Sequence, residues 1–167
     1  MTGGRFDKYF SLQKQHESEP TDHALACEYV ANFFKGIDGY GKFDIRYGQN
    51  SWHVTFPEWF NIKHDLRKRR TFLGHTFDVA IFLNFYEKPL CVFEVHQVCT
   101  CRIRLPTGRM ITCYKSKHSK PQQKENDGVI DDYMENIHPN VKVYRPEKSD
   151  CFSYAYLWEQ YKEYALL

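Results

Sequence analysis

Asp78 and Glu94 are the residues of this sequence whose types and spacing most directly imply chemistry. Asp78 lies in a β-rich run over 76–85, and Glu94 lies in a second run over 89–98. The segment 86–88 between the runs is typical of a hairpin turn. A hairpin centred on this turn places the aspartate directly opposite the glutamate, on one face of the strand pair. The sequence therefore predicts two adjacent carboxylates.

Two carboxylates in this arrangement repel each other. Opposing side chains on a strand pair have Cβ atoms about 4.5–5.5 Å apart. At about 5 Å and an effective dielectric constant near 20, the repulsion is on the order of 3 kcal/mol. A divalent cation or a shared proton offsets that cost, and hard ions such as Mg²⁺ or Mn²⁺ favour oxygen ligands. A register shifted by one residue would instead separate the two carboxylates onto opposite faces.

The alternative is that one carboxylate is solvated and the other pairs with a nearby arginine or lysine. Glu94 fits that alternative poorly, because Phe93 and Val95 flank it and the apolar run 90–92 precedes it. A free charge is costly in such surroundings. We therefore expect a metal site that contains Asp78 and Glu94.

The two runs resemble the motif strands of the PD-(D/E)xK nuclease superfamily. The run 76–82 looks like its aspartate strand, and 88–96 looks like its Glu-x-Lys strand. Two positions depart from the pattern: Phe77 replaces the proline before the aspartate, and His96 replaces the lysine. The resemblance of the sequence itself is confined to 76–97, whereas the order of elements agrees from residue 21 to residue 165.

This resemblance implies a divalent-metal-dependent nuclease that hydrolyses phosphodiester bonds of DNA or RNA. Mg²⁺ or Mn²⁺ would be held by Asp78, Glu94 and the backbone carbonyl of Val95, and would activate the attacking water. His96 could orient that water or stabilise the transition state in place of the lysine. Lys115 or Lys117 could also reach the site from a neighbouring hairpin.

A different class of function is compatible with the same fold. In that alternative the chain is a catalytically inactive module that binds nucleic acid or a protein partner, and His96 marks a decayed site. Two basic stretches could contact phosphates, although a nuclear-import signal or a solvated loop explains them equally well. Their residues are Arg67, Lys68, Arg69 and Arg70 in the first stretch and Lys115, Lys117 and Lys120 in the second.

Bulk properties limit the other possibilities. A chain of 167 residues suits one domain, and a net charge of +2 leaves any attraction to nucleic acid, DNA more than RNA, to local patches. No apolar run approaches the roughly 20 residues of a membrane-spanning helix, and 1–10 lacks a signal-peptide core. We expect an intracellular protein, cytoplasmic or, in a eukaryote, nuclear. The sequence is also compatible with a homodimer or a larger protein complex.

The cysteines Cys99, Cys101 and Cys113 could form a zinc site with His118. Ordinary thiols packed in the protein explain them better, because the paired spacing of zinc ligands is missing.

The elements that must position the carboxylates follow from periodicity and turn residues. We expect a loose arm over 1–20 and a single domain over 21–167. The fold class is α/β: a central mixed β-sheet flanked by helices, with a restriction-endonuclease-like α-β-β-β-α-β core and an inserted β-hairpin. The predicted elements are a helix that begins at residue 21 or 22, strands 42–47 and 51–56, the hairpin over 76–98, a second hairpin over 100–114, a helix over 121–137, a strand over 141–144 and a final helix near 155–165.

Overall fold

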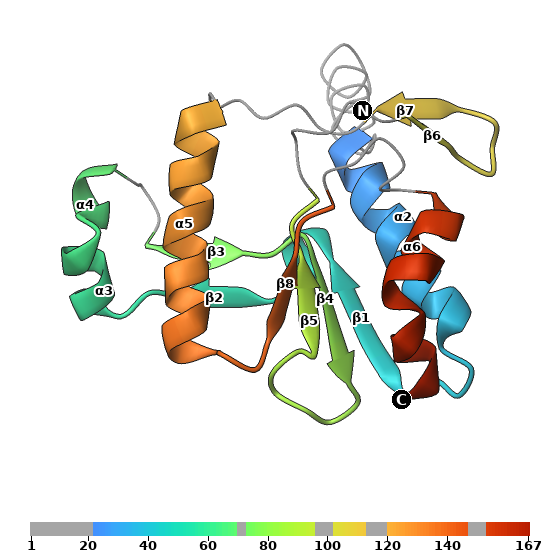
Figure 1. Cartoon of the computed structure of the whole chain (residues 1–167), viewed down its shortest axis with the longest axis horizontal. Coiled ribbons are helices and arrows are strands. Elements are labelled where there is room, and N and C mark those ends of the chain that lie inside the picture. Colours follow the sequence, from blue (N-terminus) through green and yellow to red (C-terminus); the bar gives the residue numbers. More distant parts are fainter. Residues whose placement is uncertain (1–21, 70–72, 96–101, 113–119, 147–152) are drawn as a thin grey trace, which may run out of the picture.

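Four strands form a mixed sheet at the centre of the molecule (Figure 1). The computed structural model describes residues 22–69, 73–95, 102–112, 120–146 and 153–167. The strand order is β1-β4-β5-β8; β4 pairs antiparallel with β1 and β5, whereas β5 pairs parallel with β8. These strands are β1 (Phe43–Tyr47), β4 (Val79–Leu83), β5 (Cys91–Phe93) and β8 (Lys142–Tyr144).

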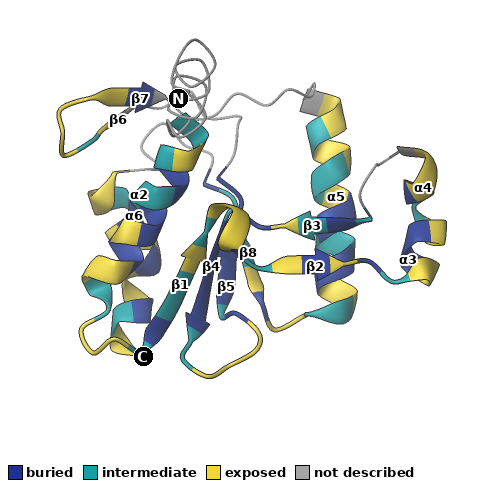
Figure 2. Cartoon of the chain, turned by 180° about the vertical axis from the view of Figure 1, so that it is seen from behind, coloured by how far each residue is buried: buried dark blue, intermediate teal, exposed yellow. Residues whose placement is uncertain are grey.

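Both faces of the sheet are covered by helices. On one face lie α2 (Asp22–Ile37) and α6 (Tyr154–Tyr161), which continues as η2 (Lys162–Leu166). On the other face lies α5 (Lys120–Ile137). A strand between two such layers must be apolar on both sides, and β5 with most of β4 is accordingly buried (Figure 2).

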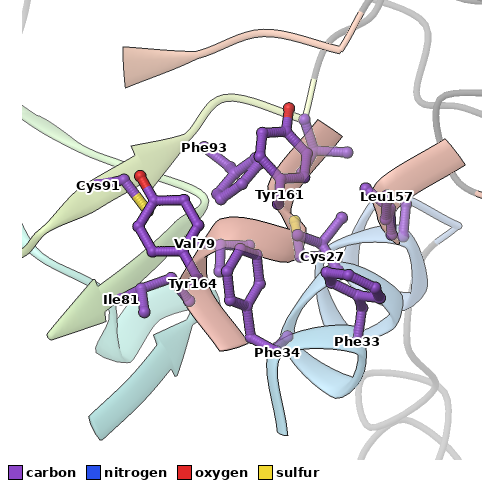
Figure 3. Close-up of a cluster of buried hydrophobic side chains, with 14 of the residues drawn as sticks. Cys27, Phe33, Phe34, Val79, Ile81, Cys91, Phe93, Leu157, Tyr161 and Tyr164 are labelled. Carbon is purple, nitrogen blue, oxygen red and sulfur yellow. The ribbon is translucent and has the colours of Figure 1, made fainter. Parts of the chain in front are cut away.

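The alternation along the strands divides the buried side chains into two cores. Val79 and Ile81 pack with α2 and α6, whereas Ala80 and Phe82 pack with α5. Figure 3 shows the first core, where aromatic side chains of α2, β5, α6 and η2 converge. Phe34 of α2 is at its centre and contacts several other rings.

Three smaller units extend this frame. The first unit is a two-stranded sheet of β2 (His53–Thr55) and β3 (Gly74–Thr76). The second is the pair of short helices α3 (Glu58–Lys63) and α4 (Leu66–Arg69), which connects these two strands. A Cβ at Gly74 would lie 2.6 Å from the carbonyl oxygen of Val54, so this pairing requires glycine. The third unit is the hairpin of β6 (Arg102–Arg104) and β7 (Met110–Thr112), which contacts α2; η1 (Gly48–Asn50) follows β1.

Most of the predicted elements are confirmed, including the helix that begins at Asp22, the hairpin with its turn after β4, the second hairpin and α5. The prediction of one continuous strand from Thr76 is wrong. Residues 74–76 form β3 and pair with β2, and Phe77 stacks on Trp52 instead of sharing a face with Val79. The chain therefore bends at 77–78, directly before β4. The predicted arm 1–20 lies outside the described residues.

The coarse fold class is confirmed, since a mixed sheet lies between helices. Within the described part of the chain, no helix has the length and apolar character that crossing a bilayer requires.

Candidate metal centre

Asp78 and Glu94 lie at the adjoining ends of β4 and β5. The two strands pair in the predicted register, with Val79 opposite Phe93 and Ala80 opposite Val92. The next position of that ladder brings Asp78 opposite Glu94. The backbone N–H of Val95 donates a hydrogen bond of 2.7 Å to Asp78 Oδ2, which ties the two strand ends together.

The other carboxylate oxygen of Asp78 faces helix α2. His23 Nε2 lies 3.1 Å from Asp78 Oδ1 and donates to it. Cys27, one helical turn further along α2, places its Sγ 3.8 Å from the same nitrogen. The backbone of Asp78 is also fixed, because its carbonyl accepts from the N–H of Gly48 at 3.0 Å. This aspartate is thus held from three sides.

Glu94 is bound to a different histidine. Only 8% of the residue is exposed, and its Oε1 accepts a hydrogen bond from His75 Nε2 of β3. Burial raises the pKa of Glu94 to about 7; His75 opposes that rise, and the charge of Asp78 adds to it. The two carboxylates are therefore close enough to repel each other, as the sequence predicts.

His23 also responds to this concentration of negative charge. Burial alone would lower the pKa of His23, but the hydrogen bond and charge of Asp78, together with the charge of Glu94, raise it above the ordinary value. Burial, with the same two carboxylates, raises the pKa of the Cys27 thiol as well. The site thus holds protons that a bound cation would displace.

Three donor atoms of this site could hold a metal ion. One ligand atom each from His23, Cys27 and Asp78 lies within 4.8 Å of the others. Glu94 is a second carboxylate at this end of the sheet and would add another oxygen donor if it turned away from His75.

Arg145 brings a positive charge to the same end of the sheet. Phe93 is opposite Tyr144 in the parallel pair of β5 and β8, so Glu94 and Arg145 follow as neighbours. Arg145 Nη1 donates to Asp131 at 2.8 Å, and Arg145 Nε lies 3.7 Å from Asp127, both on α5. The charge of Arg145 acts on Glu94 and partly offsets the rise in its pKa.

Two described side chains of the first basic stretch pair with acidic residues of the same region. Arg67 pairs with Glu58 at 2.6 Å, and Lys68 lies 3.9 Å from Asp65. Helix α4, which carries both residues and ends at Arg69, lies on the far side of α5 from α2 (Figure 1). The expectation that this stretch holds phosphates close to the metal stays a prediction for Arg67 and Lys68.

The structure describes some of the other predicted site residues and leaves four of them out. Val95 is buried and joined to Asp78, and Lys120 is the first residue of α5. The remaining members of the predicted set lie outside the described residues: His96, Arg70, Lys115 and Lys117.

Sequence reasoning missed four residues of this centre. His23 and Cys27 have the four-residue spacing that puts two side chains on one helix face, and this was the available signal. His75 and Arg145 had none. The parallel pairing of β5 with β8 brings Arg145 beside Glu94, and the bend at 77–78 brings His75 there; local periodicity specifies neither.

No match to this chain was found among protein-family models, curated proteins or solved structures. The function is therefore inferred from the geometry of the site.

The raised pKa of Glu94 predicts how stability depends on pH. The folded state holds this proton up to about pH 7, whereas the ordinary value is 4.5. The free energy of unfolding therefore falls as the pH rises through this window, by about 3 kcal/mol at most. Glu94→Gln, which does not titrate, should gain stability relative to wild type between pH 4.5 and 8 in thermal melts.

Glu58→Gln serves as the matched control. The hydrogen bond from Arg67 lowers the pKa of Glu58, so its contribution to stability is lost only at lower pH. This variant should run parallel to wild type between pH 5 and 8. If Glu94→Gln also runs parallel, Glu94 titrates normally and the prediction is wrong.

Proposed function

We propose that this chain is a divalent-metal-dependent nuclease of PD-(D/E)xK type, acting on phosphodiester bonds of DNA or RNA. The observation that carries the proposal is the pairing of Asp78 and Glu94 at adjoining strand ends, with the Val95 N–H bound to Asp78. Two carboxylates beside a histidine at one sheet end are a donor set for a hard or intermediate divalent ion.

The order of elements supports the same assignment. Helix α2, the antiparallel strands β1, β4 and β5, helix α5 and the parallel strand β8 follow the α-β-β-β-α-β order of that superfamily. The segment from β2 to β3 is then one insertion, between β1 and β4, and the β6–β7 hairpin is another, between β5 and α5. Asp78 directly precedes β4 and Glu94 directly follows β5, the second and third strands of the proposed core.

In this proposal Asp78, Glu94, the Val95 carbonyl and His23 would hold the ion, Mg²⁺ or Mn²⁺. The ion would supply charge neutralisation at the scissile phosphate and lower the pKa of a water molecule. His75 orients the Glu94 carboxylate through its hydrogen bond, and Arg145 offsets negative charge beside it. His96 would orient the attacking water.

A second function is favoured by one specific observation. Both carboxylates already have a histidine partner, His23 for Asp78 and His75 for Glu94, so the protein can hold the pair by its own hydrogen bonds without a metal ion. That arrangement would suit an inactive module with the same fold, which binds nucleic acid or a protein partner.

Cleavage assays separate the two functions. Labelled single- and double-stranded DNA and RNA would be incubated with Mn²⁺, Mg²⁺ or a chelator, using wild type, Glu94→Ala and the control Glu58→Ala. The proposal predicts metal-dependent cutting by wild type and by the control, because Glu58 is an exposed residue of α3. Cutting should be lost in Glu94→Ala. Binding without cutting by any of the three proteins would favour the inactive module.

A further inference from the structure

Three donors of different chemistry meet where the first turns of α2 approach Asp78. His23 offers an imidazole nitrogen, Cys27 a sulfur and Asp78 a carboxylate oxygen, all within 4.8 Å. His23 Nε2 lies 3.1 Å from Asp78 Oδ1 and 3.8 Å from Cys27 Sγ. Cys27 contributes a soft donor that an all-oxygen magnesium site does not contain.

These separations suit a small tetrahedral ion. Zinc binds nitrogen and oxygen at about 2.0–2.2 Å and sulfur at about 2.3 Å, which places neighbouring ligand atoms about 3.3–3.6 Å apart. The two observed separations lie on either side of that range. The sulfur and the carboxylate oxygen lie within 4.8 Å of each other, so side-chain rotations that draw these two together would bring the three atoms onto one ion.

The position of Cys27 determines which ions can use it. Its side chain is 2% exposed and packs in the core with Phe33 and Leu157 (Figure 3), so only an ion already held by His23 and Asp78 would reach the sulfur. Mg²⁺ and Mn²⁺ prefer oxygen ligands and would leave the thiol unbound. Zn²⁺ binds thiolate strongly and would engage it.

We propose that His23, Cys27 and Asp78 form a zinc site, with a fourth position for Glu94 or water. On binding, the thiol proton leaves to solvent as the zinc–sulfur bond forms. The proton that His23 Nε2 donates to Asp78 leaves as well, so the imidazole binds through Nε2 in its neutral form with its one remaining proton on Nδ1. Asp78 is shared with the proposed nuclease centre, so Zn²⁺ would displace the activating ion and inhibit cleavage. The inhibition rests on the proposed function, whereas the zinc binding does not.

Cobalt provides a direct readout of the sulfur ligand. Co²⁺ would be titrated into the full chain, followed by displacement with Zn²⁺. A tetrahedral site with Cys27 should give intense visible bands and a thiolate-to-cobalt charge-transfer band, both removed by Zn²⁺. Cys27→Ala should lose the charge-transfer band and weaken zinc binding by more than about 100-fold, because even residues that only orient a ligand cost about 10–100-fold.

Two controls make the result specific. Cys91→Ala removes another buried thiol, in β5, and should keep the cobalt spectrum. A variant with Cys99, Cys101 and Cys113 all changed to serine should keep it too. Of these variants, only Cys27→Ala should lose the charge-transfer band. Persistence of the band in Cys27→Ala, or its loss in the triple variant, would overturn the zinc site. Circular dichroism and cooperative melting confirm that each variant is folded.

The same experiment separates this inference from the nuclease. Wild type that cuts nothing with Mn²⁺ but gives the cobalt spectrum would refute the proposed function and leave the zinc site standing. A protein that cuts with Mn²⁺ and shows only weak octahedral cobalt bands would do the reverse. If both hold, Zn²⁺ should inhibit wild type strongly and Cys27→Ala at least about tenfold less.

Discussion

Asp78→Asn is expected to abolish metal binding and metal-dependent cleavage while the protein stays folded. Asparagine keeps an oxygen that can accept the Val95 N–H, so the link between the strand ends is preserved. It removes the negative charge that faces His23 and Glu94. Cleavage should fall by at least about a thousand-fold, more than the loss of one hydrogen-bond donor to a transition state costs.

Thermal melting measures the binding part of this prediction. Mn²⁺ at about 100 times its dissociation constant should stabilise wild type by about 2.7 kcal/mol, which is on the order of 5–10 °C for a chain of this size. Asp78→Asn should not respond. Asp44→Asn is the matched control, because Asp44 is a half-exposed aspartate of β1 paired with Arg46 and should leave the response unchanged. A Mn²⁺ shift that survives Asp78→Asn would refute the assignment of Asp78 as a ligand.

The pairing of β4 with β5 was predictable for a physical reason. Both strands are buried on two faces, so their apolar residues mark both ends of the connection over 84–90, and the centre of that connection fixes the register. A one-residue shift would have moved Val79 and Ile81 from one core to the other. The opposition of Asp78 and Glu94 follows from this register.

The start of the first strand was not predictable from the same pattern. Thr76, Phe77 and Val79 are all good strand residues, yet the chain changes partner between them. The change depends on Trp52, whose ring stacks on Phe77, and on Gly74, which allows β3 to approach β2. Such contacts join segments distant in sequence, and local β propensity carries no information about them.

The partners of the carboxylates were hidden for a related reason. His23 belongs to a helix 55 residues before Asp78, and His75 reaches Glu94 only because the chain bends at 77–78. An isolated histidine in a sequence is an ordinary surface or core residue. Its role emerges only when packing places it beside a carboxylate.

The packing of α2 against the sheet connects the core to the site. Phe34 near the end of α2 contacts Phe93, with ring centroids 5.4 Å apart, and Phe93 directly precedes Glu94. Cys27 lies in the same core, one turn from His23 (Figure 3). The aromatic core therefore sets the distance between the helix that carries His23 and the strand end that carries Glu94.

Phe34→Ala is expected to destabilise the folded protein strongly. Phe34 is 0% exposed, and its ring also meets those of Phe33 and Tyr164 at 5.4 and 5.7 Å. Removal of a buried phenylalanine ring costs about 3–5 kcal/mol in the free energy of unfolding. The midpoint of thermal unfolding should fall by on the order of 10 °C. Denaturant titration at fixed temperature gives the free energy independently.

Phe85→Ala removes the same ring from the opposite environment. Phe85 lies in the turn after β4, is 105% exposed and has a positive φ of 71°. Its ring is fully accessible to water, so its loss should change the free energy of unfolding by no more than about 0.5 kcal/mol. Equal losses in the two variants would mean that Phe34 is not buried between α2 and the sheet. A large loss in Phe34→Ala alone, together with weaker Mn²⁺ stabilisation in the fraction that remains folded, would show that this core positions His23 and Glu94.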